Sequence, residues 1–415
     1  MRLPALLPVL LLAIILPAAA RPAAAQTRPD TSVLTARLGV DTISIERIIR
    51  TPARIEAELV TRSPRTSLQR HLATLDVAGM LTSLDITELN PATGSVTRRV
   101  THERIGDTLV IVDVGAERTT VRRVAAPRDW LPFVDLVHWP FDVALQRLRT
   151  SANASASANA SANARANARA NARASASETA KTDAPMLSGN RISPFPLAFS
   201  GRDSATITHP TRGTMRLTVL PDGAIRTLDA GATTRALVVT RSRNADVPAF
   251  AREYAARDAA GRGVGELSGR GGGDTRLLGA TLTLDYGVPM KRGRDIWGAL
   301  VKYGQLWRTG ANRATHFKTD RTLRFGDLVV PPGEYTLYSI PEATGGVLII
   351  NKQTGQNGQQ YDSTRDLGRV PLRARALTRE IEAFTIRPRA EGGKGLLALQ
   401  WDRTELVADF TVERP

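Results

Sequence analysis

Short runs of β-branched residues recur through this chain, and they constrain its fold more than any other feature. In the first half such runs lie at 42–48, 55–60 and 107–114, and the turn signal Asn-Pro-Ala-Thr-Gly occupies 90–94. Strands at such close spacing, with turn residues between them, are typical of an antiparallel meander. The first half is therefore predicted to form an antiparallel sheet.

A low-complexity segment at 151–180 interrupts these strand signals. Its Ser-Ala-Asn-Ala units change into an Asn-Ala-Arg-Ala repeat, and no side chain in it is apolar and larger than alanine. Such a segment buries too little apolar surface to offset the entropy of ordering, so we expect a disordered insertion. The alanine content also permits a helix, which the recurrent Asn and Ser weaken. Strand signals resume at 205–208 and 214–220. The strands before the insertion and those after it are therefore expected to complete one sheet.

A helix is predicted after this sheet. Asp246 is a suitable N-cap, Pro248 lies in the first turn, and Gly261 is placed to end the helix. Phe250 and Tyr254 lie on one face of the helix, as their spacing of four requires. This helix would cover the N-terminal sheet.

A glycine-rich stretch at 259–276 is predicted to be a flexible linker. It lacks the lysine–serine pair of a phosphate-binding Walker loop. The expected organisation is a signal peptide at 1–25, an N-terminal β-rich domain at 26–258, the linker, and a C-terminal domain at 277–415.

The C-terminal domain is expected to be a β-sandwich or a jelly-roll-like fold. Its strand-like runs lie at 347–351, 383–386, 396–401 and 405–410, and the last alternates apolar with polar residues. Asp402-Arg403 is a candidate turn between the last two runs. Short and numerous strands of this kind indicate a mainly β protein.

The N-terminus has the pattern of a secretory signal peptide. Arg2 precedes an apolar stretch at 6–16, and Ala23-Ala24-Ala25 is a cleavage pattern, so the mature chain is expected to start at Gln26. A membrane anchor is the alternative, but the apolar stretch is shorter than the ~20 residues that span a bilayer. No later segment is a transmembrane candidate. We therefore expect a bacterial protein that is periplasmic or secreted.

Composition excludes several classes of function. The net charge of +16 comes mainly from scattered arginines without interleaved aromatic residues, so no nucleic-acid partner is expected. The absence of cysteine excludes thiolate metal sites and cysteine catalysis. The five histidines form no metal-binding spacing, and no metal or other cofactor is expected.

The most distinctive block of the sequence runs from Trp307 to Thr315. It reads Trp-Arg-Thr-Gly-Ala-Asn-Arg-Ala-Thr and is followed by Pro-Gly-Glu-Tyr-Thr-Leu at 332–337. With Tyr-Gly-Val-Pro at 286–289, these blocks resemble the DUF2911 family, secreted bacterial β-domains of unestablished activity. The resemblance extends from about Leu282 to Val412. Arg313 departs from the family, in which an acidic residue is common at that position.

Seven residues in and after this block are candidate ligand-binding residues. An arginine fork, an amide and a hydroxyl on one shaped loop suit a carboxylate, a phosphate or a sugar. The candidates are Arg308, Asn312, Thr315, His316, Lys352, Tyr361 and Asp362. The alternative is structural, with Arg308 stacked on Trp307 and paired with a carboxylate such as Asp362.

The preferred functional hypothesis is an exported cell-envelope protein that binds a small molecule, a glycan or a lipid without catalysis. One alternative is a hydrolase with its site at the Arg308/Asn312 loop, for which His316 would be the acid or base. Another is a scaffold that binds proteins. The aromatic segment 130–141 suggests a curved sheet that holds an apolar ligand, or else a plug of the N-terminal core. Sequence does not indicate the oligomeric state.

Overall fold

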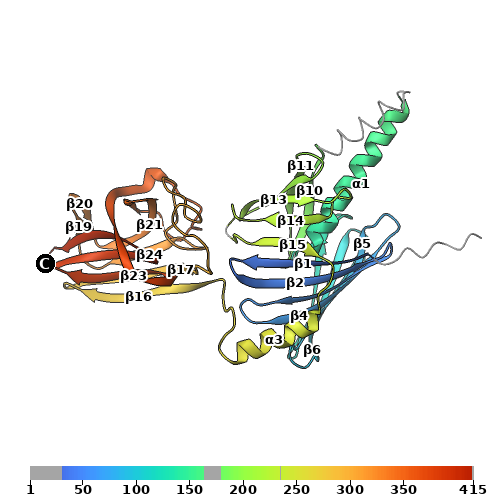
Figure 1. Cartoon of the computed structure of the whole chain (residues 1–415), viewed down its shortest axis with the longest axis horizontal. Helices are drawn as coiled ribbons and strands as arrows, with labels where there is room; N and C mark the ends of the chain where they lie inside the picture. Colours follow the sequence, from blue (N-terminus) through green and yellow to red (C-terminus); the bar gives the residue numbers. More distant parts are fainter. Residues whose placement is uncertain (1–29, 163–178, 234, 414–415) are drawn as a thin grey trace, which may run out of the picture.

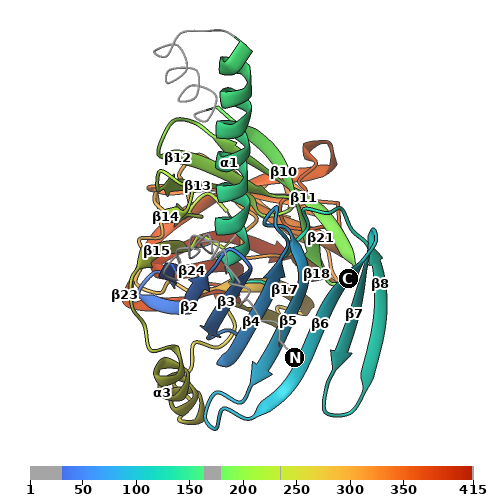
Figure 2. The ribbon, with the colours of Figure 1, turned by 90° about the vertical axis from the view of Figure 1, so that its right-hand side faces the viewer.

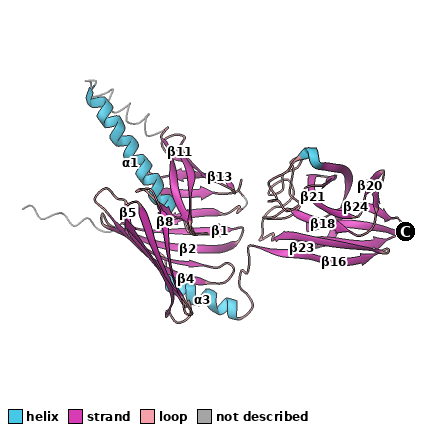
Figure 3. Ribbon diagram, turned by 180° about the vertical axis from the view of Figure 1, so that it is seen from behind, coloured by secondary structure: helices cyan, strands magenta, loops and turns pink. Residues whose placement is uncertain are grey.

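The computed structural model describes residues 30–162, 179–233 and 235–413, and it is mainly β. Figure 1 shows two lobes, each built on one sheet, and Figure 3 shows how strands dominate both. The predicted signal peptide at 1–25 lies outside the described residues. No helix among the described residues is long and apolar enough to cross a membrane.

The N-terminal lobe contains a fifteen-stranded sheet with the order β8-β7-β6-β5-β4-β3-β2-β1-β15-β14-β13-β12-β11-β10-β9. Its strands are β1 (Asp30–Leu38), β2 (Asp41–Arg50), β3 (Arg54–Thr61), β4 (Ser67–Leu75), β5 (Leu81–Leu89), β6 (Val96–Ile105), β7 (Thr108–Val114), β8 (Thr119–Ala125), β9 (Leu131–Pro132), β10 (Lys181–Ser188), β11 (Arg191–Phe199), β12 (Ser204–His209), β13 (Gly213–Val219), β14 (Ile225–Asp229) and β15 (Val238–Ser242). Strands β1 and β15 pair antiparallel and join the strands that precede the insertion to those that follow it. The prediction that these two groups of strands complete one sheet is therefore confirmed.

The first turns of helix α1 (Trp139–Ala162) pack against one face of this sheet, and its later turns project beyond the strands (Figure 2). Trp139, Phe141, Leu145 and Leu148 are buried among strand residues from both halves of the sheet. Trp130 is also fully buried, so the aromatic segment plugs the core, as one of the two interpretations predicted.

The helix corrects the expectation of disorder from residue 151 onward. Residues 151–162 continue α1, because the preceding turns are anchored in the core and alanine has the highest helix propensity. Residues 163–178 of the expected insertion lie outside the described residues.

A buried carboxylate meets the start of α1. Glu46 of β2 is fully buried and accepts hydrogen bonds from the backbone nitrogens of His138 and Trp139, at 2.8 Å and 3.0 Å. The His138 ring Nδ1 lies 2.7 Å from the same carboxylate. Glu46 thus satisfies donors that the first helical turn leaves without intrahelical partners.

Helix α3 (Val247–Ala259) covers the outer face of the sheet. As predicted, Asp246 is its N-cap and accepts a hydrogen bond from the Ala249 nitrogen at 2.9 Å. Tyr254 packs in an apolar cluster with Val33 and Val60 of the sheet. The prediction of a mainly β fold with a helix-covered N-terminal sheet is confirmed.

The C-terminal lobe contains a nine-stranded sheet with the order β16-β17-β18-β21-β22-β23-β24-β19-β20. Its strands are β16 (Ser268–Leu277), β17 (Ala280–Pro289), β18 (Thr315–Thr319), β19 (Leu323–Phe325), β20 (Leu328–Val330), β21 (Gly333–Glu342), β22 (Gly345–Asn351), β23 (Asp366–Glu391) and β24 (Lys394–Val412), and the 3₁₀ helix η1 (Ser363–Arg365) precedes β23. Leu282 of β17 and Phe410 of β24 share one apolar core. The sheet thus folds around a single core.

Two local predictions for this lobe are wrong. The second half of the expected linker is strand β16, which pairs with β17 along its whole length. A Cβ at Gly271 would lie 2.6 Å from the Val288 side chain, so this glycine allows the strands to approach closely. Asp402 lies inside β24, and the turn before that strand contains Gly392 and Gly393 in left-handed conformations.

The two lobes meet at the turn between β1 and β2. The Val40 nitrogen donates to the Arg292 carbonyl at 3.1 Å, and the Arg292 guanidinium lies 2.6 Å from the Asp41 carboxylate. A Cβ at Gly39 would lie 1.9 Å from the Arg292 carbonyl oxygen, so only glycine fits there. This contact brings the loop before β15 close to the C-terminal lobe.

Acidification is expected to destabilise the N-terminal lobe through His71. Trp139 Nε1 donates to His71 Nδ1 at 3.1 Å, and burial, with repulsion from His102, lowers the His71 pKa to about 3. The unfolded chain binds this proton at a pKa of ~6.5, so the stabilisation is complete above that pH and is lost as pH falls toward 3. At up to ~1.36 kcal/mol per pH unit below 6.5, lowering the pH from 8 to 5 should remove about 2 kcal/mol. Urea unfolding at both pH values tests this, and an equally steep decline in His71→Gln would contradict it.

Candidate functional site

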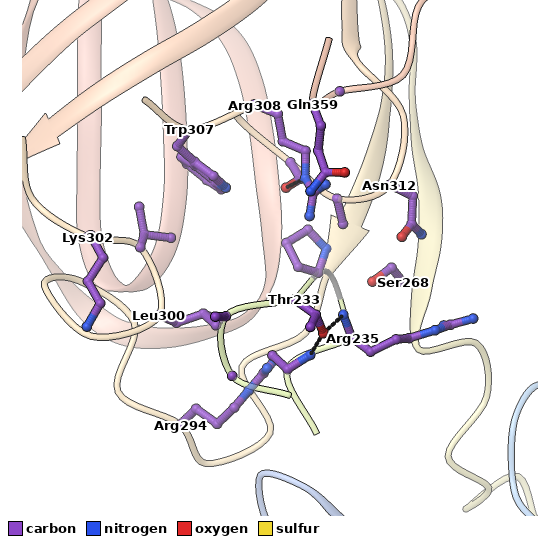
Figure 4. Close-up of a pocket in the computed structure, with 18 of the residues that line it drawn as sticks. Thr233, Arg235, Ser268, Arg294, Leu300, Lys302, Trp307, Arg308, Asn312 and Gln359 are labelled. Atoms are coloured by element: carbon purple, nitrogen blue, oxygen red, sulfur yellow. Dashed lines mark hydrogen bonds between the residues drawn. The ribbon is translucent and has the colours of Figure 1, made fainter. Parts of the chain in front are cut away.

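A cavity of about 590 Å³ lies between the two lobes. The N-terminal lobe contributes Leu38, residues 231–233, Arg235 and Ala236, and the C-terminal lobe contributes chiefly 299–302, 306–308 and 310–312. Figure 4 shows labelled side chains from both lobes around this space. We call it the interlobe cleft, and its size is within the range of roughly 300–1,000 Å³ typical of small-molecule sites.

The Trp307–Thr315 loop forms one wall of the cleft and is held from both sides. The Trp307 nitrogen donates to the Ser339 carbonyl of β21 at 2.7 Å, and the Ala311 nitrogen donates to the Gly287 carbonyl of β17 at 3.0 Å. Inside the loop, Thr315 Oγ1 donates to the Thr309 carbonyl at 2.7 Å. The loop is therefore a rigid extension of the sheet.

Two residues of this loop adopt backbone conformations that are rare outside glycine. Thr309 has a φ of 53° and Asn312 a φ of 62°. Strained residues of this kind persist only where surrounding contacts hold them, and they are frequent at functional sites. Gly310, between them, allows close packing, because a Cβ there would lie 2.9 Å from the Gly287 carbonyl oxygen.

Arg308 points from this loop into the cleft without a carboxylate partner (Figure 4). It is half-buried, and its Nε lies 3.4 Å from the Gly310 carbonyl. No described Asp or Glu forms an ion pair with it, and burial lowers the pKa of its guanidinium. Gly358 makes room for this side chain, since a Cβ there would lie 2.7 Å from Arg308 Cδ.

Three further cations line the cleft, namely Arg235, Arg294 and Lys302. Arg294 donates to the carbonyls of Lys291 and Met290, and burial lowers its pKa. Arg235 is paired with Asp135. The lining residues, all in the described part of the chain, include no aspartate or glutamate. The cleft therefore favours an anion.

A smaller hollow of about 190 Å³ adjoins the cleft. It shares Arg235, Asn312 and Gln359 with the cleft and adds Arg212. The Arg212 guanidinium lies 2.6 Å from the Asp135 carboxylate, which Arg235 also contacts. One carboxylate thus faces two guanidinium groups, so this end of the cleft is also positive.

The part of the chain that carries Arg308 matches a known protein family. Residues 274–410 match the DUF2911 family model, described as a protein of unknown function. The resemblance drawn from the sequence is thereby confirmed. No curated protein matches this chain.

The matches among solved structures include one that covers about half of this chain. It is described as the crystal structure of a β-barrel-like protein of domain of unknown function DUF1849 from Brucella abortus. The identity is 9%, the TM-score is 0.31, and the match covers 53% of this chain and 99% of that chain.

Three of the predicted site residues in the DUF2911 region lie together at the cleft: Arg308, Asn312 and Tyr361. Asn312 is exposed there. The Tyr361 hydroxyl donates to Asp366 at 2.7 Å, and its ring packs edge-on against Tyr338.

The other four predicted residues do not line the cleft. Thr315 is buried and holds the loop. His316 Nε2 accepts a hydrogen bond from the Gly355 nitrogen at 3.0 Å. Lys352 is exposed, and the Asp362 carboxylate accepts from the Thr364 nitrogen at 2.9 Å to cap η1.

The structural alternative for Arg308 is wrong, because neither Asp362 nor any other described carboxylate forms an ion pair with it. Trp401 instead stacks on Trp307, with ring centroids 6.0 Å apart, and Phe384 contacts the Trp307 edge. Trp401 belongs to the buried core of this lobe, and Trp307 is partly buried against that core.

Sequence reasoning missed Arg235, Arg294, Lys302 and Gln359. Arg235 comes from the other lobe, and no local pattern around it indicates a site. Arg294 could have been found, because it opens the run Arg-Asp-Ile-Trp-Gly at 294–298, inside the region that resembles DUF2911. Within the described residues, no group of three or more His, Asp or Glu side chains is placed to hold a metal ion.

Proposed function

We propose that this protein is exported to the cell envelope and binds an anionic small molecule in the interlobe cleft without catalysing its conversion. The export part rests on the signal-peptide pattern at 1–25. The binding part rests on one observation, the half-buried Arg308 guanidinium that faces the cleft without a carboxylate partner.

Keeping such a cation partly buried and unpaired costs stability, so its presence needs a functional reason. An anion in the cleft would supply the missing acceptor. A planar guanidinium can donate two parallel hydrogen bonds to a carboxylate or phosphate. Arg294 and Lys302 would add attraction from neighbouring parts of the lining.

The hydrolase alternative has less support. It requires an acid or base beside the Arg308/Asn312 loop, and His316 and Asp362 are both absent from the cleft lining. The scaffold alternative requires a large exposed apolar patch, whereas the cleft is a concave site with cations.

Arg308→Gln is expected to weaken binding of inorganic phosphate at least tenfold, which corresponds to ~1.4 kcal/mol. The free variant should be at least as stable as the native protein, because Arg308 has no ion pair to lose. Calorimetric titration and thermal unfolding measure the two quantities.

Arg313→Gln is the matched control. Arg313 belongs to the same loop but is exposed, pairs with Asp285 at 2.9 Å and does not line the cleft. Its replacement should change phosphate affinity less than twofold. Equal phosphate affinity in the native protein and Arg308→Gln would refute the proposal, as would unfolding of the free Arg308→Gln variant.

A further inference from the structure

The interlobe cleft has an apolar side as well as a cationic one. Leu300 and Leu306 line it beside Trp307 and Arg308. Leu306 is 43% exposed and Leu300 is half-buried, so both present aliphatic surface to the cavity. A ligand that covered this surface would gain free energy from burial in proportion to its own apolar area.

The charged groups of the cleft favour an anionic ligand over a neutral sugar. Neutral side chains such as Ser268 and Asn312 could accept from a hydroxyl, but the charged lining residues are all cations, whose donors are best matched by an anionic group. A stacking platform is also restricted, because Trp401 covers one face of Trp307 and Trp297 meets it edge-on. The accessible apolar surface is largely aliphatic, which favours a hydrocarbon chain.

We infer that the ligand is a single-chain amphiphile with an anionic head. Its carboxylate or phosphate monoester would bind the Arg308 guanidinium, and its hydrocarbon chain would lie against Leu300 and Leu306. This inference rests on the proposed function and narrows it, because anion binding alone does not require a chain.

A series of n-alkanoates from acetate to decanoate, below their micelle concentrations, tests the inference by calorimetric titration of the whole protein. Each methylene that becomes buried should raise the affinity up to about fourfold, the equivalent of ~0.8 kcal/mol. Octanol, which has the same chain length as octanoate but no charge, should bind at least tenfold more weakly than octanoate.

Two variants separate the head from the chain. Leu306→Ser should reduce the dependence on chain length and leave acetate affinity unchanged. Arg308→Gln should weaken every alkanoate at least tenfold and leave the chain-length dependence unchanged. Leu278→Ser is the control for loss of an exposed leucine, because Leu278 is also 43% exposed but lies outside the cleft lining.

The outcomes distinguish this inference from the proposed function. If acetate and decanoate bind equally well and both depend on Arg308, the amphiphile inference fails and the anion site stands. If octanol binds as tightly as octanoate and Arg308→Gln has no effect, both fail. An equal loss of octanoate affinity in Leu306→Ser and Leu278→Ser would also overturn the inference.

Discussion

Glu46→Gln is expected to destabilise the N-terminal lobe by roughly 3 kcal/mol, the upper end of the cost of leaving a buried donor without its acceptor. Glu46 is fully buried and accepts hydrogen bonds from the backbone of His138 and Trp139 and from the His138 ring. Glutamine keeps one acceptor oxygen but turns an NH₂ group toward a donor. The first turn of α1 would then contain buried donors without acceptors. Urea unfolding at pH 7 measures the loss.

Glu56→Gln is the control for this substitution. Glu56 lies on the adjacent strand β3, its side chain is 41% exposed, and it pairs with Arg54 on the surface. Exposed ion pairs contribute roughly 0–1 kcal/mol, so the control should remain close to the native protein. Equal stability of the two variants would show that Glu46 does not hold α1.

Gly287→Ala is expected to destabilise the C-terminal lobe by about 3 kcal/mol, at the upper end of the usual overpacking penalty. A Cβ at this position would lie 1.8 Å from the Ala311 carbonyl oxygen, which is a backbone atom and cannot turn aside as the end of a flexible side chain could. The loop must move away from β17 and lose the bond between the Ala311 nitrogen and the Gly287 carbonyl. The affinity for phosphate should fall as well, because Arg308 belongs to the loop and moves with it.

Gly269→Ala provides the comparison in the neighbouring strand. A Cβ at Gly269 would meet no heavy atom within 4 Å. Thermal unfolding and phosphate titration should therefore give nearly native values for this variant. Native phosphate affinity in Gly287→Ala would mean that the loop does not position Arg308.

The candidate site was only partly predictable. Arg308 and Asn312 could be named because arginine, glycine and asparagine at such short spacing require a shaped loop rather than a regular strand. Lys352 and Asp362 come after the Trp307–Thr315 block in the sequence but lie outside the cleft. Lys352 directly follows the end of β22, and Asp362 caps η1. Arg235 carries no local signal and reaches the cleft only through contact between the lobes.

The strands and helix α3 followed from sequence, because alternation, turn residues and capping residues act within a few positions of each other. The extent of α1 and the pairing of the glycine-rich strand β16 did not, because burial of Trp139 and close packing against Val288 override local propensity. The cleft depends on contacts between residues more than 200 positions apart, such as Asp41 and Arg292. Only the tertiary structure brings such residues together, because their proximity is set by packing of two lobes and not by local sequence.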